Sequence, residues 1–193
     1  MQALLKKAYQ NDILILNNQT VTSFQELNDG VEVETNGITF KTNKLLYTTN
    51  GFASQLTNNQ VKPARAQVLI TKPIPNLDIK GTFHLDKGYF YFRNINDRIL
   101  FGGGRNLDFE GETTTSHDTT ELIQNRLEEL LKTVILPHKA FEIEHRWSGT
   151  MGVGTHKKPI VEQLSNNVYC GVRMGGMGVA IGSLVGQELA DLV

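Results

Sequence analysis

A glycine-rich turn close to the C-terminal end carries the strongest chemical signal in the sequence. An apolar run ends at Val172, three glycines follow at Gly175, Gly176 and Gly178, and a helical pattern continues to Val193. A strand that enters a helix through glycines leaves backbone N–H groups bare at the positive end of the helix dipole. We expect this turn to face an anion or a polarised carbonyl. Tight packing of the helix on a sheet, without a ligand, is the alternative.

Aromatic residues alternate along a second segment, which reads Tyr89-Phe90-Tyr91-Phe92. Successive residues of a strand point to opposite faces, so the two tyrosines share one face and the two phenylalanines share the other. One face belongs to the core, and the other could form the floor of a substrate pocket; packing on both faces is the alternative. Arg93 and Trp147 could shape the same pocket, or serve the structure only.

The histidines and the single cysteine indicate neither a metal site nor hydrolase chemistry. The five histidines are scattered, without the close spacing of metal ligands on one element. Cys170 lies in an apolar run, where a thiol acts as a small apolar filler. We find no Ser-His-Asp order and no nucleophile elbow. We therefore predict neither a metal centre nor a hydrolase.

Composition and charge exclude several classes of partner. The 193 residues are 39% hydrophobic and 20% charged, which is enough to bury a sizeable core. The formal net charge of -1 and the pI near 6.5 provide no field that would attract a nucleic acid or an acidic membrane surface. We find no apolar run suited to a membrane span, and the first ten residues lack the core of a signal peptide. We expect a cytoplasmic protein.

The elements that position these residues follow from hydrophobic periodicity. Helical spacing predicts a short helix over 4–9, a long helix over 119–136 and a final helix over 178–193, and Asp118 with Glu121 has capping-box spacing. Alternating patterns between turn residues predict strands over 12–16, 19–27, 30–35, 38–41, 44–49, 67–71, 81–85, 88–93, 98–103, 141–147 and 167–172. Many strands with few helices indicate an α+β fold with a mixed, largely antiparallel sheet.

Five segments, in order, resemble a known family. They read GITFKTNKLLYTTNGFAS, VKPARAQVLIT, GYFYFRNINDRILFGGG, RWSGTMGVGTHKKPIV and NNVYCGVRMGGMGVAIGSLVGQELADLV. Together they resemble the FAD-dependent D-amino-acid oxidase/glycine oxidase superfamily (DAO), and the third and fourth resemble the branch that includes gamma-glutamylputrescine oxidase. The resemblance covers nearly the whole chain. It implies that the final glycine turn brings the N-terminus of its helix to the pyrimidine end of the flavin.

The resemblance also implies a domain organisation and a set of site residues. Residues 1–60 would form part of an FAD-binding domain with a β-meander, 61–148 a substrate-binding sheet with the long helix, and 149–193 a return to the FAD-binding domain. The implied cofactor-binding residues are Thr49, Asn50, Gly51, Arg173, Met174, Gly175, Gly176, Met177, Gly178 and Val179. The implied substrate-binding residues are Tyr89, Tyr91, Arg93, Trp147 and Met151. Arg173 faces flavin or substrate in this interpretation, with a surface ion pair as the alternative.

Two departures from the family pattern limit what the resemblance implies. Met151 occupies the place where glycine and D-amino-acid oxidases have an arginine that pairs with the substrate carboxylate. We therefore do not expect a simple α-amino acid held in that manner. The Gly-x-Gly-x-x-Gly unit that cradles the FAD pyrophosphate is absent from the sequence. We expect that this chain lacks an N-terminal FAD-binding half, binds FAD poorly by itself, is inactive alone and tends to self-associate.

The function that follows is that of an FAD-dependent oxidoreductase. In the full-length protein we expect oxidation of a C–N bond of an amine or amino-acid-like substrate, with hydride transfer to flavin. The residues identify no catalytic acid or base. The alternative is a non-catalytic module, built on the same half-fold, that binds a ligand or a partner protein.

Overall fold

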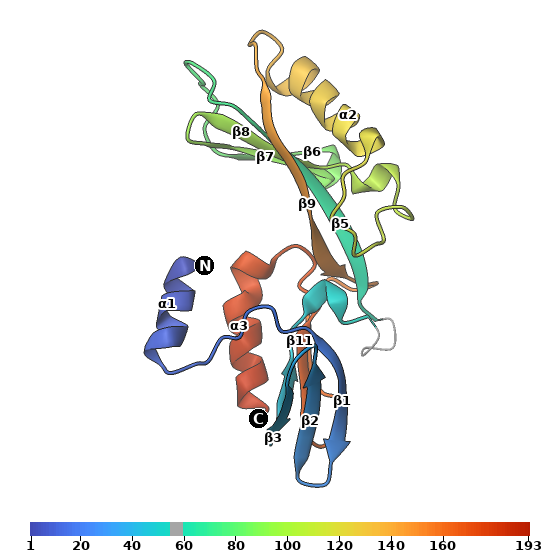
Figure 1. The fold of residues 1–193 in the computed structure, drawn as a ribbon. Helices are drawn as coiled ribbons and strands as arrows, with labels where there is room; N and C mark the ends of the chain where they lie inside the picture. Colours follow the sequence, from blue (N-terminus) through green and yellow to red (C-terminus); the bar gives the residue numbers. More distant parts are fainter. Residues whose placement is uncertain (55–59) are drawn as a thin grey trace.

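The computed structural model describes residues 1–54 and 60–193, and it has a mixed α+β architecture as predicted. Figure 1 shows two lobes. The α2 lobe consists of a five-stranded sheet and the long helix. The α3 lobe contains two three-stranded sheets and both ends of the chain. The long strands β5 (Lys62–Thr71) and β9 (Ile143–Val153) run from the first lobe toward the second. The division into three segments at 60/61 and 148/149 stays a prediction.

The α2 lobe is organised around a wholly antiparallel sheet with the strand order β6-β7-β8-β5-β9. Its remaining strands are β6 (Thr82–Leu85), β7 (Phe90–Ile95) and β8 (Arg98–Gly103). The hairpin between β7 and β8 turns at Asn96 and Asp97, which both have positive φ, as a tight two-residue hairpin requires. This register aligns one row across all five strands: His84, Tyr91, Gly102, Val68 and Trp147.

The opposite face of this sheet packs against helix α2 (Glu121–Leu130), which continues as one π-helical turn, Leu131–Ile135. The shared core contains fully buried residues from both layers, among them Leu69, Ile99, Phe101, Ile123 and Leu127. The predicted helix is therefore present. Its predicted cap is wrong, because Thr120 is the N-cap residue and Asp118 instead accepts a hydrogen bond from Ser116.

A buried polar cluster fastens the loop before α2 to strand β5. The Arg65 guanidinium donates to both carboxylate oxygens of Glu112, at 2.7 and 3.0 Å, and Gln67 donates to the same carboxylate. Gln67 also bonds the backbone N–H of Thr120 and the side chain of Gln124. The hydrogen bond to Glu112 raises the pKa of Arg65. Arg65 and Gln67 are therefore buried and paired.

The α3 lobe begins with helix α1 (Gln2–Gln10) and the predicted meander, β1 (Val21–Leu27), β2 (Gly30–Thr35) and β3 (Thr39–Thr42). The second sheet has the order β10-β11-β4, with β10 (Ile160–Gln163) antiparallel and β4 (Leu45–Tyr47) parallel to β11 (Val168–Val172). Helix α3 (Gly178–Asp191) packs on β11, where Leu189 and Val185 approach Gly171 closely. Three short 3-10 turns complete the described fold: Asn50–Phe52, Asp86–Gly88 and Arg105–Leu107.

Several sequence-based boundaries are wrong, each for a physical reason. Residues 12–16 form no strand, although they are apolar, because no strand of the described chain pairs with them. Strand β9 continues to Val153 through two glycines, because β5 supplies hydrogen bonds along its whole length. Strand β10 was not predicted. The strand over 44–49 shortens to Leu45–Tyr47 and is half-exposed, where the sequence predicted burial.

Candidate functional site

The face of the five-stranded sheet that α2 leaves open borders a cleft of about 560 Å³. All five strands contribute from this face: Val68, Thr82, His84, Tyr91, Arg93, Leu100 and Met151. Phe83 and Phe92 also border the cleft, although the register places them in the row of Phe101, which faces α2. The glycine turn before α3 closes one side. The residues that line the cleft are Val68, Thr82, Phe83, His84, Gly88, Tyr91, Phe92, Arg93, Leu100, Met151, Gly175, Gly176 and Met177. The cleft therefore brings the aromatic strand and the glycine turn together.

The glycine turn presents backbone donors that the described chain does not use. Gly175 and Gly176 have φ values of 56° and 84°, in the left-handed region that glycine tolerates. Met177 is the N-cap residue of α3, and no side chain caps the helix. Within the described residues, the N–H groups of Gly178 and Val179 donate to no acceptor. No described atom lies within 4 Å of the place where a Cβ of Gly175 would be. An electron-rich group can therefore approach this helix tip.

The turn is fixed from two sides. The side-chain oxygen of Asn50 accepts the N–H of Met174 at 3.1 Å, and the N–H of Gly175 donates to the carbonyl of Gly152 at 2.9 Å. Gly152 has no room for a side chain, because a Cβ there would lie 2.6 Å from the Asn50 side-chain oxygen. Thr49 and Gly51 flank Asn50, and Thr49 contributes its carbonyl to the short turn Asn50–Phe52. Asn50 therefore supports the glycine turn directly, and none of these three predicted cofactor-binding residues lines the cleft.

Arg173 and Met174 precede the glycine turn, and both make contacts within the protein. Arg173 is 8% exposed, has a φ of 63°, and donates from its Nε to the carbonyl of Lys158 at 2.9 Å. It joins the end of β11 to the loop before β10 and does not line the cleft. The sulfur of Met174 lies against the backbone of Gly178 and Gly182, so it fills the space that these glycines leave open. The predicted cofactor residues that line the cleft are Gly175, Gly176 and Met177.

Three of the five predicted substrate-binding residues line the cleft: Tyr91, Arg93 and Met151. Trp147 lies on the same face of the sheet, in the row of Tyr91, but outside the cleft lining. Tyr89 packs its ring against the edge of Phe109, with centroids 6.1 Å apart, and also lies outside. Burial in the cleft raises the pKa of the Tyr91 hydroxyl, although 37% of the residue's surface stays exposed. This hydroxyl is therefore protonated at neutral pH and can donate a hydrogen bond.

The sequence analysis did not identify Val68, Thr82, His84 or Leu100 as residues of the cleft. Val68 and His84 stand in the same row as Tyr91, and Thr82 pairs with Arg93. This signal was available, because residues that pair across an antiparallel sheet point to the same face. Once the pairing of the strands is known, the position of Tyr91 indicates which neighbouring residues lie on the same face.

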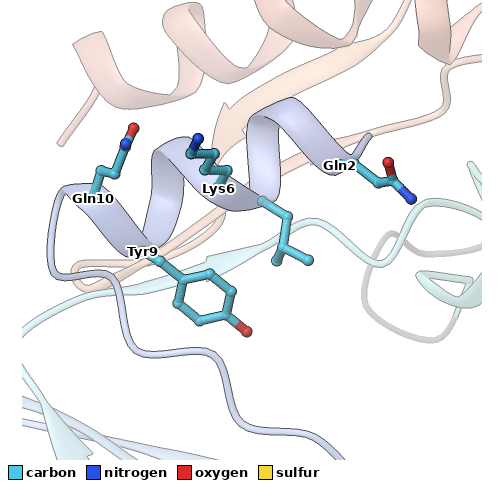
Figure 2. Close-up of a pocket in the computed structure, with 5 residues that line it drawn as sticks. Gln2, Lys6, Tyr9 and Gln10 are labelled. Atoms are coloured by element: carbon cyan, nitrogen blue, oxygen red, sulfur yellow. The ribbon is translucent and has the colours of Figure 1, made fainter.

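Other parts of the described chain offer less to a ligand. Figure 2 shows a shallow depression on helix α1, surrounded by Gln2, Lys6, Tyr9 and Gln10. It lies on a helix that buries no residue. The described residues contain no group of three or more His, Cys, Asp or Glu side chains placed to hold a metal ion. Among them, no helix combines the length and the apolar character that a membrane span needs.

The family of the chain follows from a comparison of its sequence with family models. A family model described as FAD dependent oxidoreductase, abbreviated DAO, matches residues 1–192. The chain therefore belongs to this family. No protein with a curated description matches the chain significantly.

Solved structures of this class share the fold at low sequence identity. L-proline dehydrogenase from P. horikoshii has a TM-score of 0.80 and 20% identity, over 99% of this chain and 53% of that chain. Glycine oxidase from Bacillus cereus has a TM-score of 0.75 and 17% identity, over 97% and 54%. L-alpha-glycerophosphate oxidase from Mycoplasma pneumoniae, with FAD bound, has a TM-score of 0.75 and 18% identity, over 99% and 54%. The chain spans about half the length of these structures.

Proposed function

We propose that the full protein oxidises a C–N bond of an amine or amino-acid-like substrate, and that the cleft is the place of this reaction. The observation that carries the proposal is the cleft itself, which has an aromatic sheet face on one side and the uncapped tip of α3 on the other. Membership of an FAD-dependent family supports the reaction class. The resemblance to the gamma-glutamylputrescine oxidase branch is part of this proposal.

The residues at the glycine turn fit the pyrimidine end of a flavin. Gly175 leaves open space above the turn, and the N–H groups of Gly178 and Val179 are free to donate to a carbonyl or to a nitrogen that gains negative charge. When bound, FAD would supply the two-electron chemistry. The arrangement of the turn is preorganised, because Asn50 and Gly152 fix it without any ligand.

The sheet face would hold and orient the substrate. Tyr91, Leu100 and Val68 provide the floor on which the substrate would lie. Tyr91 can donate one hydrogen bond, and Arg93 provides a cation. A substrate amine that enters neutral needs no side-chain base, so we assign none.

A second half of the protein would complete the cofactor site. The chain spans about half of its structural neighbours and lacks the glycine motif that cradles the pyrophosphate. Helix α1 presents Leu4 and Tyr9 at 60% and 54% exposure, a surface that such a half would cover. We propose that the isolated chain binds FAD poorly, is inactive and self-associates through such surfaces, and that the full protein acts in the cytoplasm.

The test uses the full natural chain that contains this sequence. We expect it to purify with flavin absorbance, and we expect amines to bleach that absorbance without oxygen. The variant Gly175→Ala adds a methyl group only where a ligand would lie, at a cost in stability of about 1 kcal/mol for the left-handed backbone. We expect flavin reduction by the amine to slow by about tenfold or more in this variant.

Gly186→Ala is the matched control. Gly186 lies within α3, with no described neighbour within 4 Å of its Cβ position, so the change should stabilise the helix slightly and leave reduction unchanged. A colourless full chain that FAD does not reconstitute would reject the proposal and favour the non-catalytic binding module. Equal rates for Gly175→Ala and wild type would reject the role of the turn.

A further inference from the structure

A second pocket lies beyond the cleft, at the end of the five-stranded sheet where β5 begins and β9 ends. Its volume is about 280 Å³, and its lining residues are Gln60, Lys62, Arg105, Val153, Gly154 and Thr155. None of these residues lines the cleft. Val153 follows Met151 by two positions on the same face of β9, so the pocket lies roughly 7 Å farther along the strand. The described lining contains two cations, Lys62 and Arg105, and no acid.

Arg105 is an arginine that the fold buries and leaves without a counter-ion. Its Nε is buried and makes no hydrogen bond, and within residues 1–54 and 60–193 its guanidinium forms no ion pair. The ring centroid of Phe109 lies 4.9 Å from the guanidinium carbon and covers one face of the group. Burial lowers the pKa of Arg105, although the charge of Glu112 acts in the opposite direction. Glu112 is not available as a partner, because both of its oxygens bind Arg65.

A third cation lies directly behind the pocket. Arg173 is 8% exposed, and its Cδ lies 2.7 Å from the place where a Cβ of Gly154 would be. Its Nε donates to the carbonyl of Lys158, which is a neutral acceptor, and no acidic side chain of the described chain pairs with it. Buried cations in proteins are normally paired, because an uncompensated buried charge is strongly destabilising. The pocket therefore lacks the negative charge that its surroundings require.

The other polar groups of the lining are also hydrogen-bond donors. The N–H groups of Gly154 and Thr155 donate to no acceptor within the described chain, and Thr155 adds a hydroxyl. The donors come from three elements: β5, the turn Arg105–Leu107 and the loop after β9. A carboxylate presents two oxygens in one plane, whereas a phosphate presents oxygens in several directions and accepts strong hydrogen bonds from guanidinium groups. We propose that this pocket binds a phosphate-type oxyanion, either inorganic phosphate or the phosphoryl group of a metabolite, with Arg105 as its main ligand.

The bound oxyanion would link the two lobes. Lys62 and Arg105 belong to the sheet of the α2 lobe and the turn that follows it, whereas Arg173 follows β11 in the α3 lobe. Without an anion, these like charges repel one another across the junction. A shared counter-ion reverses that effect. The stability of the folded protein should therefore depend on the concentration of the anion.

The first experiment measures binding of inorganic phosphate by calorimetry, at constant ionic strength, in the full natural chain with FAD bound. We expect one saturable site. Arg105→Met should weaken binding by roughly ten- to a hundredfold, which is the usual loss for a charged hydrogen bond. Lys62→Met changes an exposed residue and should weaken binding by about two- to fivefold without affecting folding. No saturable binding to the wild type, or equal binding to Arg105→Met, would overturn the proposal.

Arg126→Met is the matched control for both experiments. It removes an exposed arginine of α2 that pairs with Glu129, far from the pocket in the sequence and absent from its lining. We expect it to bind phosphate as the wild type does. A loss of binding equal to that of Arg105→Met would mean that phosphate responds only to the total charge, and would overturn the proposal.

The second experiment compares thermal unfolding of the same proteins with and without phosphate. Without phosphate, Arg105→Met should be at least as stable as the wild type, because it removes an uncompensated buried cation. With saturating phosphate, the Tm of the wild type should rise by a few degrees and that of Arg105→Met should not. A Tm of Arg105→Met well below that of the wild type without phosphate would mean that a carboxylate from elsewhere in the full chain already occupies the pocket. That result would overturn the proposal.

Three further titrations identify the source of the anion. Ethyl phosphate that binds as tightly as inorganic phosphate supports the phosphoryl group of a metabolite, and much weaker binding of the ester supports the free ion. Acetate that binds as tightly as phosphate would overturn the assignment to this class of anion. Phosphate that binds only after FAD is removed would assign the pocket to the pyrophosphate of the cofactor, and would also overturn the proposal. None of these measurements requires amine oxidation, so they remain decisive if the proposed function fails.

Discussion

The two faces of the five-stranded sheet are built from alternate residues of the same strands, yet they differ in almost every physical property. On the α2 face, Leu69 and Phe101 are fully buried, and the buried charges of Arg65 and Glu112 pair with each other. On the cleft face, Tyr91 and Trp147 expose 37% and 42% of their surfaces, and Arg93 has no partner in the described chain. The first face satisfies its own groups and provides stability. The second leaves Tyr91, Arg93 and Trp147 exposed to solvent.

The difference teaches how function can be located without a bound molecule. Large aromatic side chains that stay exposed beside an unpaired cation contribute little to folding, so another role must account for them. The same aromatic strand supplies both faces, with Phe90 in the core and Tyr91 in the cleft. A substitution at Phe90 should therefore change the stability of the fold, whereas a substitution at the next residue, Tyr91, should change ligand binding.

The largest test of this comparison removes one ring from each face. Phe101→Ala should lower the free energy of unfolding by about 3–5 kcal/mol, because it leaves a cavity in the buried core. Trp147→Ala should lower it by only about 1 kcal/mol, because much of the ring already contacts solvent. Chemical denaturation of both variants measures the two values. Equal losses would mean that both faces serve the core.

The second test breaks the pairing on the α2 face. Glu112→Gln leaves the Arg65 guanidinium buried without a counter-ion, and we expect a loss of about 3 kcal/mol in the free energy of unfolding. Glu129→Gln removes an exposed partner of Arg126 and should cost about 0.5 kcal/mol or less. Thermal and denaturant unfolding measure both. A loss below about 1 kcal/mol for Glu112→Gln would show that solvent reaches the cluster.

The smallest effect concerns the hydroxyl of Tyr91 at high pH. Burial raises its pKa in the folded state, so above about pH 10 the unfolded chain loses this proton first. The stability that depends on the protonated hydroxyl is complete below that pH and disappears as the pH rises through the folded-state pKa. Wild type should therefore lose stability relative to Tyr91→Phe as the pH rises above about 10, the ordinary pKa of a tyrosine. A difference that does not vary with pH would contradict the burial of this hydroxyl.

Local patterns in the sequence predicted most elements of the fold. Strands β2 and β8 have the predicted bounds, because alternation and turn residues determine them locally. Features that depend on distant partners were missed. The apolar stretch 12–16 resembles a strand but has no partner strand, and β9 extends through Gly149 and Gly152 only because β5 pairs with it.

The candidate site was predicted to a similar degree. Alternation predicted the face of Tyr91, the glycines between a strand and a helix predicted the turn, and Arg93 was a candidate for the same pocket. The structure places all three at one cleft. The supporting role of Asn50 depends on a hydrogen bond across 124 positions, which no local pattern encodes. Glu112 was missed for the same reason, because it lies in a polar loop and only its long-range pairing with Arg65 buries it.

The double attachment of the glycine turn has a mechanical consequence. Its two tethers end on Asn50 in the α3 lobe and on Gly152 near the end of β9, the strand that belongs to the sheet of the other lobe. A movement of one lobe relative to the other would therefore also move the glycine turn and the N-terminus of α3. The width of the cleft and the orientation of the N–H groups at the helix N-terminus would then change together.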